Sequence, residues 1–250
     1  MSRLALGLVA GLASLPVAAP VAADEPMTGA ERQAFRDEVR AYLLEHPEVL
    51  IEAMDVLQSR EEVASLDRDK QIILTNSEKI FASPDDWVGG NPQGDITLVE
   101  FMDYRCGYCR KAYDEVSKLI ESDGNIRFVV KEFPILGEAS LQSAQFAIAM
   151  RQLHGDAAYE AVHDALMTLR GEPTPETLAR LATDLGHDPQ PILDRMAAPE
   201  VRKVIEANYA LAEQMGISGT PAFVLKDMVM RGYAPLETMQ DFVAEARTGG

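Results

Sequence analysis

The chain has 250 residues, 47% of them hydrophobic, and a formal net charge of −17 at pH 7. That hydrophobic content is ordinary for a folded globular protein. The charge argues against nucleic acid as a partner, because phosphates are bound through clustered Lys and Arg side chains. It argues equally against docking on an anionic lipid surface.

The first 23 residues form a segment of their own. Arg3 is its only charged residue, and residues 4–21 are apolar and rich in Ala, Gly and Leu. Residues 21–23 supply the small side chains that signal peptidase accepts. We therefore expect residues 1–23 to be a signal peptide and the mature chain to be exported to the periplasm. A membrane anchor is the alternative, and the prolines and glycines of the segment make it a poor span.

Residues 24–84 are predicted to form a helical extension. Apolar residues recur there every seven positions in two sets: Leu43, Leu50 and Leu57, then Leu66, Ile73 and Ile80. This spacing is typical of the apolar stripe of a coiled coil. A helix over residues 47–82 would run about 50 Å, too long for one small domain to cover. We expect the segment to assemble copies of the chain into a homo-oligomer; a hairpin packed on its own domain is the alternative.

Residues 85–250 predict an α/β domain with a thioredoxin-like sheet. The expected elements are a buried strand at 96–102, a helix at 107–121, a second buried strand at 126–133, a helical insertion at about 138–216, short strands at 222–225 and 228–231, and a helix at 236–247. The first three make a βαβ unit with parallel strands. The whole pattern is that of a thioredoxin-type sheet interrupted by helices.

The only two cysteines, Cys106 and Cys109, are separated by two residues at the start of the first helix of this domain. A disulfide across so short a loop adds little stability, because the entropy that it removes from the unfolded chain grows with loop length. The spacing therefore favours redox chemistry over a structural bridge. The helix dipole favours a thiolate at the first sulfur, so Cys106 is predicted to attack and Cys109 to resolve. Gly107 and Tyr108, which lie between them, are expected to tune the redox potential.

Three segments resemble the exported DsbA-like thiol:disulfide oxidoreductases. They are residues 99–109 around the dithiol, residues 129–137 at the second strand and residues 216–223 further along. Residues 32–57 also resemble the amino-terminal segment of the ScsC branch, the suppressor-of-copper-sensitivity proteins. That branch includes trimeric disulfide isomerases, so the resemblance implies a trimer as the favoured assembly.

The DsbA-like resemblance implies further site residues. Thr220-Pro221 would be a cis peptide facing the dithiol, with the Thr220 backbone pairing with an extended substrate. Glu100 matches the buried acid of the family, which would take the proton of Cys109. Lys131 is expected either as the charge partner of Glu100 or as a strand-end lysine in solvent. Tyr108 would add a substrate-contacting surface beside the sulfurs, with ordinary packing as the alternative.

The dipeptide between the cysteines is Gly-Tyr, whereas the strong oxidants of the family have Pro-His. A cation that favours the thiolate is therefore missing, which favours isomerising or reducing disulfides of exported proteins over forming them. An isomerase must stay reduced, which implies a DsbD-like membrane reductase as a partner. A DsbA-like oxidase recharged by a DsbB-like membrane oxidant is the alternative.

A copper-tolerance protein that binds Cu(I) through Cys106 and Cys109 is the rival of another class, since soft thiolates suit this ion. The four histidines form no recognisable ligand set in the sequence. No other metal site is expected, and no cofactor beyond the redox-active Cys106–Cys109 disulfide.

Overall fold

The structure is a computed structural model that describes residues 27–248. The chain divides into two compact units, Met1–Ser59 and Arg60–Gly250, which we call the amino-terminal unit and the main unit and describe separately. The predicted signal peptide lies outside the described residues. Within residues 27–248, no helix has both the length and the apolar character needed to cross a bilayer.

From residue 29 on, the amino-terminal unit is mainly helical, as its apolar pattern predicts. Helix α1 spans Gly29–Glu45, and α2, Glu48–Phe81, begins in this unit just after Pro47. Thr28 starts α1 through a capping box: its hydroxyl accepts the Glu31 N–H, and the Glu31 carboxylate accepts the Thr28 N–H. The apolar residues of the unit that are exposed in the single chain include two sets at helical spacing: Phe35, Val39 and Tyr42 in α1, and Leu50, Met54 and Leu57 in α2.

The main unit is built on a five-stranded sheet with the order β1-β3-β2-β4-β5. Its strands are β1 (Trp87–Gly90), β2 (Ile96–Met102), β3 (Ile126–Glu132), β4 (Ala222–Leu225) and β5 (Met228–Arg231). Strands β2 and β3 are parallel, and the other neighbours are antiparallel. This is the predicted thioredoxin-like arrangement. Strand β1, which the sequence analysis did not predict, lies in a glycine-rich stretch and pairs with β3 at the sheet edge.

The side chains of β2 alternate between two hydrophobic cores, one on each face of the sheet. Leu98 and Met102 face the larger core, which includes residues of α3 (Gly107–Asp123) and α9 (Leu236–Thr248). Phe101 faces the second core, to which α8 (Pro199–Gln214) contributes. The two faces therefore place neighbouring β2 residues in different environments.

The last part of α2 belongs to the main unit and closes the second core. Ile73 and Ile80 are buried there beside β2 and β3 residues. Asp69 accepts two hydrogen bonds from the guanidinium of Arg231 in β5, both 2.8 Å long. The predicted boundary between residues 84 and 85 therefore differs from the observed division after Ser59. Two members of the second heptad set, Ile73 and Ile80, therefore cover the sheet of their own chain, whereas its first member, Leu66, is exposed.

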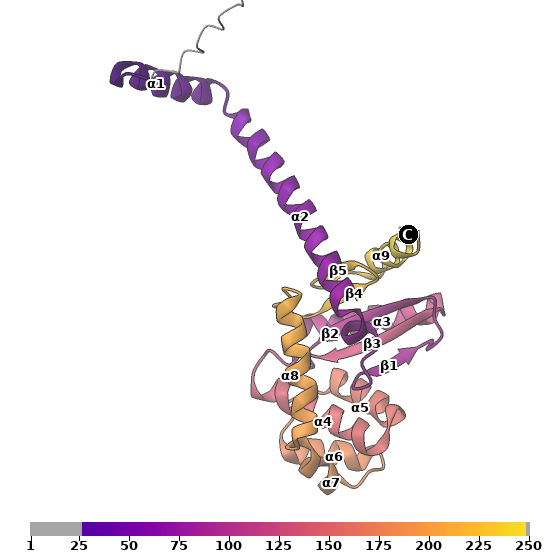
Figure 1. The fold of residues 1–250 in the computed structure, drawn as a ribbon. Coiled ribbons are helices and arrows are strands. Elements are labelled where there is room, and N and C mark those ends of the chain that lie inside the picture. The colour runs from indigo at the N-terminus through magenta and orange to yellow at the C-terminus, as the bar shows by residue number, and fades with distance from the viewer. Residues whose placement is uncertain (1–26, 249–250) are drawn as a thin grey trace, which may run out of the picture. The chain divides into compact units, whose positions relative to one another are not determined.

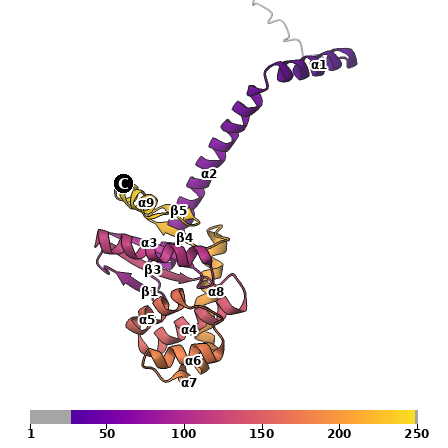
Figure 2. The same cartoon turned by 180° about the vertical axis from the view of Figure 1, so that it is seen from behind.

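The helical insertion follows β3: its first four helices gather at one end of the main unit, and α8 runs from there alongside the sheet (Figures 1 and 2). Its helices are α4 (Glu138–His154), α5 (Asp156–Thr168), α6 (Pro175–Asp184), α7 (Pro189–Met196) and α8. Helices α4 and α5 pack on each other, and α5 also contacts α3 and β1. The insertion thus reaches the helix that begins at the two cysteines.

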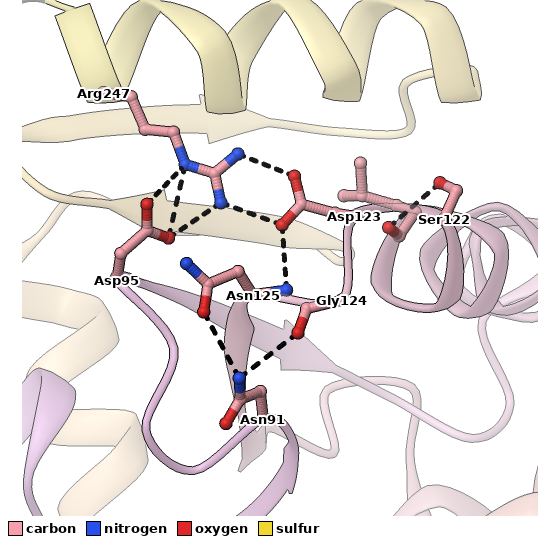
Figure 3. Close-up of polar contacts among 8 residues, drawn as sticks. Asn91, Asp95, Ser122, Asp123, Gly124, Asn125 and Arg247 are labelled. Carbon is pink, nitrogen blue, oxygen red and sulfur yellow. Dashed lines mark hydrogen bonds and ion pairs between the residues drawn. The ribbon is translucent and has the colours of Figure 1, made fainter.

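Arg247 fastens the carboxyl-terminal helix α9 to the sheet (Figure 3). Its guanidinium donates to both carboxylate oxygens of Asp95, just before β2, and to both of Asp123, at the end of α3. These two carboxylates raise the pKa of Arg247 above its ordinary value. One side chain thus joins three elements of the larger core.

Candidate active site

Cys106 is the N-cap residue of α3, directly after the loop that ends β2. Its backbone is extended (φ −74°, ψ 118°), and its carbonyl accepts the Arg110 N–H of the first helical turn. The side chain is 7% exposed, whereas that of Cys109 is fully buried. Only the first sulfur is therefore within reach of a second protein, as the attacking role requires.

The loop before β4 brings Thr220 and Pro221 to this sulfur. The Thr220-Pro221 peptide is cis, as predicted. Antiparallel pairing of β4 with β2 sets Ala222 opposite Phe101, so the residues before β4 lie beside those after β2. The Cys106 thiol donates to the Thr220 carbonyl oxygen at 3.2 Å.

Glu100 lies behind the cysteines as a buried acid without a charged partner. Its side chain is 3% exposed, and its Oε1 has no hydrogen-bond partner within residues 27–248. Burial raises the pKa of this carboxyl to about 8. Burial also raises the pKa of the Cys109 thiol, and the charge of Glu100 raises it further. The second cysteine therefore keeps its proton until a nearby base takes it, and Glu100 is near enough to affect that proton.

Glu100 also lines a pocket of about 360 Å³. Tyr113 of α3 and His163 of α5 are among the other residues of its wall. The pocket opens between these two helices, so the buried carboxyl borders space that water can enter.

Lys131 does not lie where the sequence suggested. In the parallel register Glu100 is opposite Val130, so Lys131 points to the other face of the sheet. It is 1% exposed, and its ammonium donates to the Asp86 carboxylate and to the Lys79 carbonyl. Both predicted alternatives, a partner for Glu100 and a lysine in solvent, are therefore wrong.

Asp86, directly before β1, and Lys131 of β3 form a buried ion pair. Desolvation raises the pKa of Asp86 to about 6, and the charge of Lys131 opposes that rise. The lysine of this pair lies on the face of the sheet opposite Glu100, away from the predicted proton acceptor.

A second buried acid, Glu132, lies on the same face of the sheet as Glu100 and is missing from the predicted site. Its Oε1 accepts hydrogen bonds from the hydroxyls of Tyr159 (2.6 Å) and Tyr104 (2.8 Å). The Tyr104 hydroxyl also lies 3.1 Å from Nδ1 of His163. Burial raises the pKa of Glu132 to about 8 and lowers that of His163 to about 4. The even spacing from Val130 places Glu132 on this face, but no sequence signal indicates its partners in α5.

Charged side chains hold the cysteine turn in place. Asp103, 1% exposed, accepts the backbone N–H groups of Arg105, Ile135 and Leu136. Arg105 donates to the Gly171 carbonyl (2.6 Å) and to Glu172 (2.8 Å) in the loop after α5. The turn before Cys106 is thus tied both to the segment after β3 and to the helical insertion.

The two residues between the cysteines differ in their surroundings. Gly107 is exposed, and a side chain at its position would meet open space. Tyr108 is 64% exposed and lies near Tyr233, which precedes α9. The structure therefore brings the predicted residues Cys106, Cys109, Glu100, Thr220 and Pro221 together, with Tyr108 at the surface beside them.

Comparisons with known proteins agree with this geometry. A family model described as thioredoxin matches residues 82–245, and one described as the copper resistance protein ScsC N-terminal domain matches residues 31–64. The curated relatives that match include the Na⁺/H⁺ antiporter NhaA 1 of Salinispora arenicola, 30% identical over 169 residues. That match includes 66% of this chain, which spans about a quarter of the length of the curated relatives.

Solved structures match the chain over nearly their whole length, unlike the curated relatives. A thioredoxin-like oxidoreductase from Silicibacter pomeroyi is 42% identical with a TM-score of 0.65, covering 68% of this chain and 97% of that one. The thiol-disulfide exchange protein alpha-DsbA2 from Wolbachia pipientis is 27% identical with a TM-score of 0.67, covering 73% and 97%. BcfH from Salmonella enterica Typhimurium is 27% identical with a TM-score of 0.73, covering 87% and 96%.

Proposed function

The chain belongs to the thioredoxin family, in the DsbA-like group that carries an ScsC-type amino-terminal segment, and from this we propose that it exchanges disulfides in exported proteins. One observation carries the proposal: an accessible sulfur, Cys106, faces the Thr220 carbonyl, and a buried sulfur, Cys109, lies behind it near the acid Glu100. A structural relative described as a thiol-disulfide exchange protein, alpha-DsbA2, supports the same class of reaction.

The proposed reaction begins when the Cys106 thiolate attacks one sulfur of a substrate disulfide. A mixed disulfide forms, and the other substrate sulfur leaves as a thiolate. Ionised Glu100 then takes the proton of Cys109, whose thiolate attacks the Cys106 sulfur. The products are the Cys106–Cys109 disulfide and a second substrate thiolate, so the substrate gains the two electrons that the dithiol loses.

Isomerisation begins with the same attack by Cys106 but does not use Cys109. The substrate thiolate released by Cys106 attacks a different sulfur, and Cys106 is finally expelled unchanged. We propose isomerisation or reduction as the physiological direction, because Gly107-Tyr108 supplies no cation between the cysteines. A DsbD-like membrane reductase would then keep the dithiol reduced, and the site of action would be the periplasm.

Binding of Cu(I) is a second proposed function, of a different kind. It is supported by the family model that matches residues 31–64, which is described as a copper resistance protein domain. Within residues 27–248 no three His, Cys, Asp or Glu side chains form a group that could hold a metal. A Cu(I) ion would therefore have the thiolates of Cys106 and Cys109 as its ligands. A competition titration in which Cys106→Ser leaves the Cu(I) affinity unchanged would remove this proposal.

Reactivation of scrambled ribonuclease in a glutathione buffer tests the direction of the reaction. We expect the wild-type protein to restore ribonuclease activity, Cys109→Ser to retain part of this activity, and Cys106→Ser to have none. Failure of the wild type to reactivate scrambled ribonuclease, together with rapid oxidation of reduced ribonuclease, would reject isomerisation in favour of the oxidase alternative.

A further inference from the structure

Helix α3 presents two side chains beside Cys106 on the flank that faces α9. Tyr108 and Lys111 are three residues apart, so they lie on one side of the helix. Both reach Tyr233, in the segment between β5 and α9. The rings of Tyr108 and Tyr233 are 6.3 Å apart with planes inclined by 32°, and the Lys111 ammonium lies 4.1 Å from the centre of the Tyr233 ring. The three side chains form a cluster that we call the aromatic flank.

Tyr233 is the fixed member of the aromatic flank. Its ring is partly buried and packs against the larger core. The preceding residue, Gly232, has a positive φ of 95° and donates its N–H to the Pro221 carbonyl at 2.9 Å. Glycine adopts this backbone conformation readily, whereas other residues rarely do. The segment that carries Tyr233 is therefore fastened to the cis-proline loop, against which an extended substrate would lie.

The exposed ring of the aromatic flank belongs to Tyr108. One face of Tyr233 is already occupied by the Lys111 ammonium, a cation–π contact. Tyr108 is 64% exposed and is only two residues from the attacking sulfur. A substrate that binds through its cysteine to Cys106 can therefore place a neighbouring side chain on this ring.

We propose that the aromatic flank is a specificity subsite for an aromatic side chain next to the reacting cysteine of the substrate, an inference that rests on the function proposed above. A substrate ring can pack on Tyr108 in an offset or edge-to-face arrangement, which stabilises a pair of rings beyond the burial of area alone. Tyr233 keeps Tyr108 in position for this contact. The positive charge of Lys111 disfavours substrates with Lys or Arg at the same place.

Cysteine peptides activated with thionitrobenzoate test the inference on the full-length reduced protein. The Cys106 thiolate attacks the peptide sulfur, a peptide–enzyme disulfide forms, and thionitrobenzoate leaves as a coloured thiolate. Four peptides differ only at the residue after cysteine, which is Phe, Ala, Glu or Lys. We expect Phe to react roughly fivefold faster than Ala, the size of effect that one aromatic contact supplies. We expect Lys to react most slowly.

Each variant is compared by its ratio of Phe-peptide to Ala-peptide rate, because a general change in the reactivity of the Cys106 thiol affects both rates equally and cancels. Tyr233→Leu should bring this ratio close to 1, whereas Tyr233→Phe, which keeps the ring, should preserve it. Lys111→Gln should raise the relative rate of the Lys peptide. Lys118→Gln, an exposed lysine seven residues further along α3, is the matched control and should change none of the ratios.

The outcomes separate the two proposals. Equal rates for all four peptides, a ratio that survives Tyr233→Leu, or a Glu peptide that reacts fastest would overturn the aromatic subsite and leave disulfide exchange standing. Absence of thionitrobenzoate release from every peptide would overturn both.

Discussion

Glu100 is 3% exposed, lies near Cys109, and has an oxygen without a hydrogen-bond partner among residues 27–248. Its pKa of about 8 in the folded chain exceeds the usual value of about 4.3 in an unfolded one. The folded state therefore binds an extra proton between these two pH values. The contribution of this carboxyl to stability is complete below about pH 4.3 and is lost as pH rises through 8.

Replacing Glu100 by Gln should remove this pH dependence. We expect the unfolding free energy of the reduced wild type to fall more steeply between pH 5 and pH 9 than that of Glu100→Gln. The difference should be on the order of 3–5 kcal/mol across the window. Glu132 titrates in the same range in both proteins, so it cancels in the comparison. Denaturant unfolding at several pH values measures the effect, and parallel curves for the two proteins would show that Glu100 is not a protonated acid in the fold.

Lys131 provides the complementary prediction. Lys131→Met leaves the Asp86 carboxylate buried without its cation, so we expect a loss of about 3–5 kcal/mol in the free energy of unfolding. Adding Asp86→Leu should restore part of that loss. Because Lys131 and Glu100 lie on opposite faces of the sheet, Lys131→Met should not shift the pH profile of thiol exchange. A shift in the pH profile of thiol exchange, measured on the folded variant without denaturant, would mean that Lys131 acts on Glu100.

At the scale of elements, Arg247 joins α9 to Asp95, just before β2, and to Asp123 of α3. We expect Arg247→Gln to destabilise the main unit by about 1 kcal/mol, since solvent screens this partly exposed pair of carboxylates. Amide hydrogen exchange should accelerate first in α9, and salt should reduce the difference from wild type. Lys203→Gln, on the exposed side of α8, is the control. Unchanged exchange in α9 would show that apolar packing alone holds the helix.

The strands that the sequence predicts are those with strong local patterns. Strands β2 and β3 are runs of β-branched and aromatic residues, which suit a buried sheet whatever surrounds them. Strand β1 has Gly89 and Gly90 in half of its length, and its pairing with β3 provides what local propensity does not. Lys131 shows a second limit: its strand is predictable, but an offset of one residue decides the face.

The site residues also divide into those with a local sequence signal and those without one. Cys106, Cys109 and the cis-proline loop carry sequence signals, because spacing and backbone chemistry are local. Tyr233 carries none: it belongs to the site through its contact with Tyr108 and the bond from Gly232 to Pro221. The contact of Tyr233 with Tyr108 joins segments more than a hundred residues apart, so it comes from topology and not from composition.

At the scale of the whole molecule, the amino-terminal unit carries apolar side chains that the single chain leaves exposed. Exposed apolar stripes of this kind mark an interaction surface. We expect the mature protein to be a homo-oligomer, with a trimer favoured. The full chain with Leu50→Lys and Leu57→Lys should have the mass of a monomer in light scattering. Glu52→Gln with Asp55→Asn provides a control that changes the net charge by the same +2 at exposed positions of the same helix. Equal monomeric masses for wild type and variant would end the assembly proposal.

The central claim is the division of roles between the two sulfurs, and trapping of the mixed disulfide tests it most directly. Reduced Cys109→Ser, mixed with a disulfide-containing protein, should accumulate a covalent adduct that mass spectrometry locates on Cys106. Reduced Cys106→Ser should form almost none, because Cys109 is fully buried and holds its proton. An adduct on Cys109, or equal amounts from both variants, would contradict the account.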